Sequence, residues 1–200
     1  MSWVRKTGVS LVAGGAMLCA AGVGTAAYGR VMARLAIARF RAQGGATALW
    51  DAKRIQAYEK VLRVKSVPPL AVLRVPAVGI EAPVLEGTSD DAMNRGVGHI
   101  AGSALPGEVG NVGIAGHRDG FFRALKDVKV GEVVKLERQT SAGMQSDRYK
   151  VERISVVQPT DVSVVASTSE ATLTLVTCYP FYFVGSAPQR YVVQAKLIRE

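Results

Sequence analysis

The stretch Thr172-Leu173-Thr174-Leu175-Val176-Thr177-Cys178 decides both the fold and the chemistry that this sequence predicts. Threonine, valine and leucine dominate it, which is typical of a buried β-strand. Tyr179 and Pro180 follow directly, so the Cys178 thiol is expected where a strand gives way to a loop. A rigid strand fixes the position of such a side chain, while the loop admits a ligand.

Similar short runs, rich in valine, isoleucine and leucine, recur after residue 69 and are separated by glycine, proline and aspartate. They predict strands at residues 70–75, 80–85, 112–116, 132–137, 148–157, 172–178 and 191–198. Seven or so strands at this spacing indicate a mostly β domain, either a barrel or a sandwich.

Only short helices are expected between these strands. Residues 89–95 are predicted to form one, because Thr88 and Asp91 have the spacing of a capping box and Gly96 supplies the stop. A second helical turn is predicted at residues 121–126, where Asp119 is expected to orient the loop or cap the turn.

The N-terminal third has a different composition. Gly8 to Tyr28 is a run of residues without charge, preceded by Arg5 and Lys6. At about 1.5 Å rise per residue such a run is long enough to cross a bilayer. We therefore expect residues 1–30 to be a transmembrane signal anchor with a cytoplasmic N-terminus; a signal peptide cleaved near Gly24-Thr25-Ala26 is the alternative. Residues 31–66 are predicted to be a basic helical stalk, and residues 67–200 the folded domain.

The charge of the chain is concentrated in the same region. The net charge is +9, from 25 basic and 16 acidic residues, and residues 1–66 hold 11 of the basic and 2 of the acidic ones. The remaining 14 basic and 14 acidic residues leave the folded domain formally neutral. A nucleic-acid partner is therefore not expected, whereas the basic stalk suits either a membrane surface or a solvated spacer.

The chain has two cysteines: Cys19 lies in the apolar run and Cys178 lies near the other end of the chain. They are therefore not expected to form a disulfide. A lone thiol in an exported domain indicates a reactive residue, although a small buried side chain is the alternative. A free thiol is mostly protonated at neutral pH, so a nucleophilic cysteine needs a basic or cationic neighbour. His99 and His117 are the two histidines, and no spacing typical of a zinc site joins them to the cysteines.

Of the two, His117 is the better candidate partner, because it follows the strand-like Ile114-Ala115-Gly116 whereas His99 lies in a less strand-like stretch. Arg190 begins the last apolar run. A hairpin would return it to the side of Cys178, where a guanidinium can stabilise a thiolate or an oxyanion. A structural histidine and a solvated arginine are the alternatives for these two residues.

These segments resemble the sortase family of cysteine transpeptidases. Thr172 to Cys178 is similar to the threonine-leucine-x-threonine-cysteine signature of sortases, and Arg190-Tyr191-Val192-Val193 to their final strand. The resemblance spans roughly residues 70–199. Four stretches resemble the middle of class D sortases in particular: Gly98-His99-Ile100, Ala104-Leu105-Pro106-Gly107-Glu108, Gly110-Asn111, and Ala115 to Phe122.

The resemblance implies an eight-stranded sortase barrel in which Cys178, His117 and Arg190 are catalytic and Thr177 binds substrate. It also implies cleavage after threonine of a sorting signal similar to Leu-Pro-x-Thr-Gly or Leu-Pro-x-Thr-Ala in secreted proteins. The acyl chain would then pass, through a thioacyl enzyme, to an amine of a cell-wall peptide or a protein lysine. The catalytic domain would lie on the extracytoplasmic face of the membrane.

No cofactor or metal is expected, because the calcium-binding members of the family use acidic clusters and the sequence offers only Asp90-Asp91. By resemblance, residues 159–170 lie over the peptide groove. An L,D-transpeptidase is disfavoured, since Thr177-Cys178-Tyr179 lacks the glycine-cysteine pattern of those enzymes. A catalytically silent anchored module that binds a wall polymer stays open at this point; its Cys178 would react with an alkylating reagent no faster than a free thiol.

Overall fold

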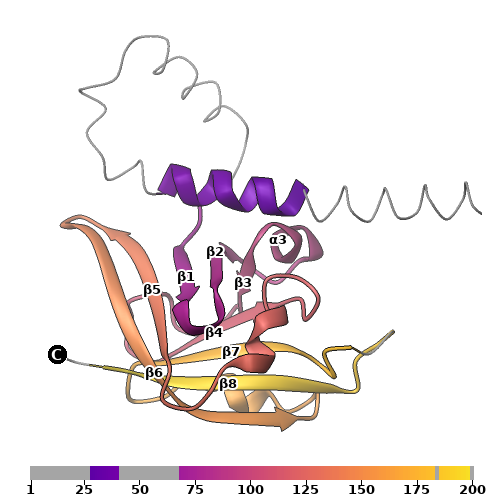
Figure 1. Ribbon diagram of the computed structural model, residues 1–200. Helices are drawn as coiled ribbons and strands as arrows, with labels where there is room; N and C mark the ends of the chain where they lie inside the picture. The colour runs from indigo at the N-terminus through magenta and orange to yellow at the C-terminus, as the bar shows by residue number, and fades with distance from the viewer. Residues whose placement is uncertain (1–27, 41–67, 183–184, 199–200) are drawn as a thin grey trace, which may run out of the picture.

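The computed structural model describes residues 28–40, 68–182 and 185–198, and its main feature is a closed barrel of eight strands (Figure 1). The strands are β1 (Ala71–Val75), β2 (Ile80–Glu86), β3 (Val97–His99), β4 (Asn111–Gly116), β5 (Val133–Thr140), β6 (Gly143–Val157), β7 (Thr172–Tyr179) and β8 (Gln189–Leu197). Around the barrel they follow the order β1-β2-β3-β4-β7-β8-β6-β5, and β5 closes it against β1. The predicted eight-stranded barrel is confirmed.

Two parallel pairs interrupt an otherwise antiparallel barrel: β2 with β3, and β4 with β7. The connection from β2 to β3 contains the helix α3 (Asp90–Arg95). Three short 3-10 helices occupy other connections, namely η2 (Pro76–Val78), η3 (Arg123–Asp127) and η4 (Val162–Val165).

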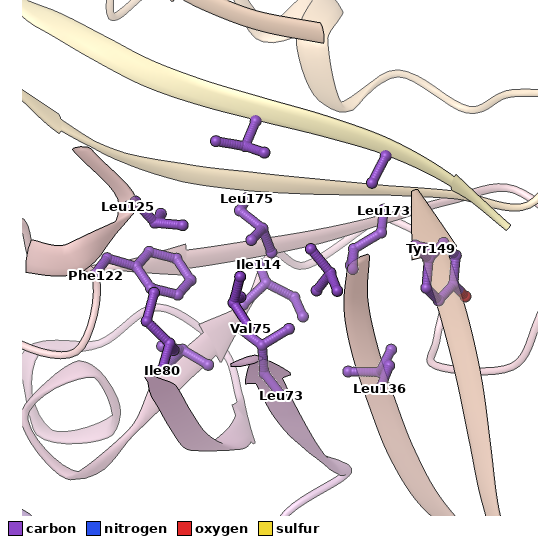
Figure 2. Packing of buried hydrophobic residues seen from close by; sticks show 14 of the residues in the cluster. Leu73, Val75, Ile80, Ile114, Phe122, Leu125, Leu136, Tyr149, Leu173 and Leu175 are labelled. Atoms are coloured by element: carbon purple, nitrogen blue, oxygen red, sulfur yellow. The ribbon is translucent and has the colours of Figure 1, made fainter. Parts of the chain in front are cut away.

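The core fills the inside of the barrel with side chains from alternating strand positions (Figure 2). Leu73, Ile114, Leu175 and Phe122 are fully buried there. Burying one side chain of this size stabilises a fold by roughly 1.5 to 3 kcal/mol relative to leaving it in water. The period of two in the sequence thus determines which face of each strand is packed and which face remains available for a site.

Two details of the predicted fold are corrected. The strand β3 was not predicted, because it has only three residues and a central glycine; a Cβ at Gly98 would lie 2.3 Å from the Gly87 carbonyl oxygen, so glycine is required for this close pairing. The cap of α3 is also different: the N-cap is Ser89, whose hydroxyl accepts a hydrogen bond from the Ala92 amide at 3.3 Å. Gly96 ends the helix as expected.

A helix at residues 28–40 lies across one end of the barrel (Figure 1). Its buried side consists of small and apolar residues at helical spacing, and Ile37 and Phe40 pack against Val72 of β1. Gly29 makes a close approach to α3, because a Cβ there would lie 2.5 Å from the Asn94 carbonyl oxygen. The first residues of the predicted stalk therefore pack against the barrel.

The rest of the N-terminal organisation stays a prediction. The predicted anchor at residues 1–30 lies almost entirely outside the described residues, as do Cys19 and the part of the stalk beyond residue 40. In the described ranges, no helix has both the length and the apolar character that a membrane crossing requires.

The barrel stability is expected to fall at alkaline pH because of Tyr149. Burial, followed by the nearby Asp147 charge, raises the pKa of Tyr149 from 10.0 to about 12. Above pH 10 the unfolded chain loses this proton while the folded chain keeps it. The contribution of Tyr149 to the free energy of unfolding is therefore fully present below pH 10 and is lost as pH rises towards 12.

Between pH 9 and 11 this loss should be on the order of 1 kcal/mol. We expect Tyr149→Phe to reduce the slope of unfolding free energy against pH in this range, measured by urea denaturation. Burial also raises the pKa of Tyr191, which should account for part of the remaining slope. An unchanged slope in Tyr149→Phe would contradict this assignment.

Candidate active site

The three predicted catalytic residues come together at one end of the strands β4, β7 and β8. Cys178 and Arg190 are direct partners in the antiparallel pair of β7 and β8. In the parallel pair of β4 and β7, Gly116 is opposite Thr177. His117 follows Gly116 and Cys178 follows Thr177, so the register brings the histidine beside the cysteine.

The pleat of β7 determines where the thiol points. Leu173 and Leu175 are fully buried in the barrel core, and a strand turns successive side chains to opposite faces. Cys178 therefore belongs to the outer face, and it is a free, partly exposed cysteine. This placement gives a thiol access to a ligand that a core cysteine would lack.

The loop that carries His117 is tightly held through its backbone. The amides of Gly120 and Phe122 both donate to the His117 carbonyl oxygen, at 3.1 and 3.3 Å. The Phe122 ring lies under the end of β4, where a Cβ on Gly116 would come within 2.8 Å of it. Gly116 thus allows the buried ring to support the turn, while the His117 side chain stays partly exposed.

Thr177, the predicted substrate-binding residue, has its side chain on the inner face. It is 2% exposed, and its hydroxyl donates to the Gly116 carbonyl oxygen at 2.7 Å. This hydrogen bond ties the strand that bears Cys178 to the strand that leads to His117. A contact between Thr177 and substrate remains a prediction, and it would have to use the backbone.

Arg190 is oriented by the loop before it. Its Nη1 donates to the carbonyl oxygens of Ala187 and Gln189 at 3.2 and 3.0 Å. Within the described part of the chain, Nη2 and Nε have no protein partner. A guanidinium held on one side in this way can offer its remaining donors to a ligand in a fixed orientation.

A cluster of three aromatic rings supports the same end of β7 and β8. Tyr179 stacks on Tyr191 with ring centroids 6.1 Å apart, and Phe181 meets Tyr191 edge to face at 5.1 Å. These rings pack against the barrel core. They support the backbone immediately after Cys178 and immediately after Arg190.

Arg118, directly after His117, and Arg123, at the start of η3, hold the segment that follows the cysteine. Arg118 donates to the carbonyl oxygens of Pro180 and Gly185, at 3.1 and 2.9 Å. Arg123 donates to Phe181 at 3.5 Å, and its guanidinium lies 4.9 Å from the centre of the Tyr182 ring. The histidine loop and the loop between β7 and β8 are therefore joined by side chains as well as by the sheet.

We expect Arg118→Ala to lower kcat/KM for peptide cleavage about tenfold, because small displacements of catalytic groups are costly. Arg118→Lys keeps the charge but cannot reach both carbonyl oxygens, and should lie between alanine and wild type. Steady-state kinetics with each variant tests this. Wild-type kinetics in Arg118→Ala would show that the two loops hold their positions without the arginine.

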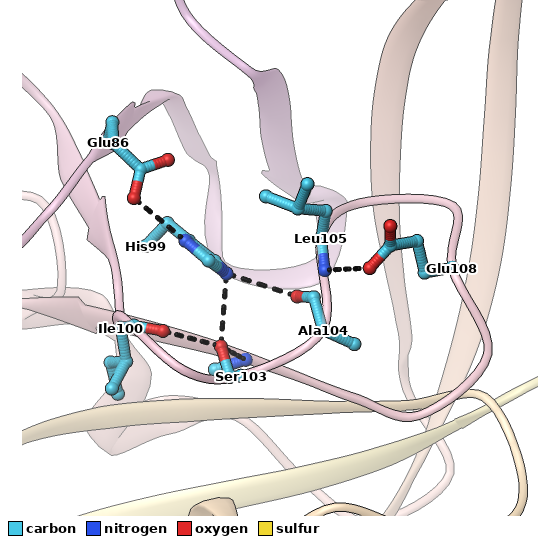
Figure 3. A network of polar contacts seen from close by, with 8 residues as sticks. Glu86, His99, Ile100, Ser103, Ala104, Leu105 and Glu108 are labelled. Carbon is cyan, nitrogen blue, oxygen red and sulfur yellow. Dashed lines mark hydrogen bonds and ion pairs between the residues drawn. The ribbon is translucent and has the colours of Figure 1, made fainter.

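His99 has a structural environment that distinguishes it from His117 (Figure 3). It is 3% exposed, and its Nε2 lies 3.1 Å from the Ala104 carbonyl oxygen and 3.0 Å from the Ser103 hydroxyl. Since a carbonyl oxygen only accepts, Nε2 carries the hydrogen. Nδ1 lies 3.4 Å from a Glu86 carboxylate oxygen. These contacts leave His99 as a link between β3 and the loop at residues 100–110.

The segment between β6 and β7 covers part of the outer face of β4, β7 and β8. Asn111 donates to the carbonyl oxygens of Val164 and Ala166, both at 3.1 Å, and Gln194 donates to Val164 at 3.4 Å. Thr174 donates to the Asn111 side-chain oxygen at 2.8 Å. The outer face of β4, β7 and β8 thus runs from a covered end at Thr174 to an open end at Cys178.

Sequence reasoning assigned no role to Arg118 or Asn111, although both lie in stretches that were compared with class D sortases. The signal for Arg118 was its position directly after His117. Asp119 caps no turn within the described residues, contrary to expectation, and is exposed. Among the residues that the structure describes, no group of three or more histidine, cysteine or acidic side chains is placed to hold a metal ion.

Comparisons with known proteins show the family to which the chain is similar. Residues 73–198 match the family model described as the sortase domain. The chain is 35% identical over 128 residues to Sortase D of Bacillus subtilis, a match that covers 64% of this chain and 63% of that protein.

Solved structures give the same result. The Sortase D5 transpeptidase of Clostridium perfringens superposes with a TM-score of 0.66 at 26% identity, covering 84% of this chain and 99% of that chain. Sortase C of Streptococcus pneumoniae superposes with a TM-score of 0.60 at 30% identity, covering 72% of each chain.

Proposed function

The chain belongs to the sortase family, and from this premise we propose that it is a cysteine transpeptidase that uses Cys178, His117 and Arg190. The observation that carries the proposal is the register of three neighbouring strands. Cys178 and Arg190 are paired across β7 and β8, and His117 leaves the end of β4 beside them. This register supports a site in which a thiol, an imidazole and a guanidinium lie together at one end of these strands.

In the proposed first half-reaction, the Cys178 thiolate attacks the carbonyl carbon of threonine in a sorting signal. The Arg190 donors that have no protein partner stabilise the negative charge that develops on the carbonyl oxygen. The peptide C–N bond then breaks, and His117 gives a proton to the departing amine. The product is a thioacyl enzyme, with the substrate joined to Cys178 through its threonine.

In the second half-reaction an acceptor amine attacks the same carbonyl carbon. The amine nitrogen forms the new amide bond, the C–S bond breaks, and the electron pair returns to the Cys178 sulfur. His117 accepts the proton that the amine loses. The Arg190 guanidinium again faces the oxyanion, so the same three side chains serve both steps.

The substrates proposed are secreted proteins with a C-terminal signal similar to Leu-Pro-x-Thr-Gly or Leu-Pro-x-Thr-Ala. The acceptor is an amine of a cell-wall peptide or of a protein lysine. Residues 8–28 would anchor the enzyme in the cell membrane by a single span, with the barrel on the extracytoplasmic face. The formally neutral barrel supports these partners better than a nucleic acid.

A peptide library tests the proposal. The full chain is incubated with peptides that contain Leu-Pro-x-Thr-Gly and Leu-Pro-x-Thr-Ala, together with an amine acceptor, and the products are identified by mass spectrometry. We expect cleavage after threonine and a new amide between threonine and the acceptor. Products cut at other bonds, or cleavage by His117→Ala at the wild-type rate, would contradict the proposed mechanism.

A further inference from the structure

An open groove of about 1420 Å³ separates the helix at residues 28–40 from the barrel. One wall is the helix, and the other includes parts of β2, α3 and the loop after β4. The helix rests on the barrel through Gly29, Ile37 and Phe40. Between these contacts, Arg30, Ala33 and Arg34 line the groove. None of the functions described above requires the groove.

The groove reaches the active site from one side only. His117, Asp119 and Phe121 line it, whereas Cys178 and Arg190 do not. In the proposed reaction the cysteine and the arginine contact the acyl part of the substrate. The imidazole exchanges a proton with the amine, first as it leaves and later as the acceptor arrives. Of the three proposed catalytic residues the groove contacts only His117, so it is placed to bind the molecule that supplies the acceptor amine.

The charges along the groove are divided between its two walls. Arg30 and Arg34 lie one turn apart on the helix wall, are exposed, and form no ion pair with described residues. On the barrel wall, Asp91 is paired with Arg95 and Glu81 with Arg74. Asp119, two residues after His117, has no side-chain partner in the described ranges.

We propose that this groove is the acceptor subsite, and that it selects amines whose chain also carries carboxylate groups. The inference rests on the proposed transpeptidase function. Asp119 attracts the ammonium form of the acceptor towards His117, and Arg30 and Arg34 bind carboxylates further along the chain. Once His117 has taken a proton, the amine attacks the thioacyl carbon, the C–N bond forms, and the C–S bond breaks to return the thiolate of Cys178.

Two small acceptors of the same shape test this inference on the full chain in detergent micelles. Glycyl-glutamate carries two carboxylates, and glycyl-glutaminamide carries neutral amides in their place. The enzyme is supplied with the sorting peptide that it cleaves fastest, and kcat/KM for transfer is measured with each acceptor. The ratio of the two values reports acceptor recognition, because effects on acylation are common to both.

We expect a ratio of about 10 in favour of glycyl-glutamate for wild type, since two partly exposed ion pairs contribute modestly. The double variant Arg30→Glu/Arg34→Glu should bring the ratio to 1 or below. Lys150→Glu/Arg153→Glu changes the net charge equally on exposed positions of β6 and should keep the wild-type ratio. Asp119→Asn should lower transfer to both acceptors and leave the ratio unchanged.

A wild-type ratio near 1, or the wild-type ratio retained in Arg30→Glu/Arg34→Glu, would overturn the acceptor subsite and leave the proposed function intact. The acceptor subsite would also be overturned if Lys150→Glu/Arg153→Glu lowered the ratio as much as Arg30→Glu/Arg34→Glu does. The ratio would then depend on net charge alone. Failure of wild type to cleave any sorting peptide would overturn the proposed function and this inference with it.

Discussion

Cys178→Ala should reduce cleavage of every sorting peptide to the uncatalysed background, a loss of at least about 10,000-fold in kcat. The reason is that the proposed reaction passes through a covalent bond to the Cys178 sulfur, and no other described cysteine is available to form it. A continuous fluorescence assay with the sorting peptide that the wild-type enzyme cleaves fastest measures the effect.

The barrel should remain folded in this variant. Cys178 lies on the outer face of β7 and is only partly buried, so its sulfur contributes little to the core. Far-UV circular dichroism and the Tm are expected to stay close to wild type. Cys19→Ala is the matched control and should keep wild-type kinetics. Turnover above background in Cys178→Ala would rule out the covalent mechanism.

Arg190→Ala should lower turnover by about 100-fold to 1,000-fold, which is typical for the loss of an oxyanion donor. Arg190→Lys should lie nearer to alanine than to wild type. Lysine keeps the charge but loses the planar set of donors, and the structure has Nη1 held by two carbonyl oxygens while the other donors remain for substrate. Turnover numbers for the three proteins with one sorting peptide give this comparison.

Alkylation of Cys178 separates this role from a simple effect of charge on the thiol. If Arg190 acts on the oxyanion, iodoacetamide should react with Cys178 at similar rates in wild type and both variants. If the guanidinium serves mainly to stabilise the thiolate, alkylation near neutral pH should slow in step with turnover in Arg190→Ala, and lysine should restore both. Matched losses of the two rates would refute the oxyanion role.

Most of the barrel was predictable because each long strand has its own run of β-branched and apolar residues. The run from Thr172 to Cys178 alternates between core and outer face, and Leu173 and Leu175 are fully buried as that pattern requires. The β5 and β6 strands extend further into a shared hairpin than predicted, with pairs from Val133–Lys150 to Thr140–Gly143. Their exposed polar ends carry no apolar signal that marks a strand.

Features that depend on contacts distant in sequence were not predictable. The strand β3 exists because Val97 pairs with Val84 and His99 with Ile114, and three residues alone do not indicate a strand. The docking of the helix at residues 28–40 depends on Gly29 meeting Asn94 across the fold. Its exposed arginines predicted only a basic stalk, and the groove beneath them was therefore not anticipated.

The sequence predicted that Cys178 and Arg190 would lie on neighbouring strands, but it did not predict the contacts that support the candidate site. The expected hairpin between Cys178 and Arg190 is present, with the two residues directly opposite each other. Burial separates the two histidines, since His99 is enclosed by Ser103 and Ala104 while His117 remains partly exposed. The contacts of Arg118 with Pro180 and Gly185 could not be derived from spacing, because they join loops that are more than 60 residues apart.

The most direct test of the account is the intact mass of the enzyme during turnover. The full chain is mixed with a sorting peptide in the absence of an acceptor amine, quenched in acid, and examined by mass spectrometry with peptide mapping. We predict an adduct on Cys178 with the mass of the peptide up to and including threonine, which disappears when an acceptor amine is added. Cleavage without such an adduct, or an adduct on any residue other than Cys178, would contradict the central claim.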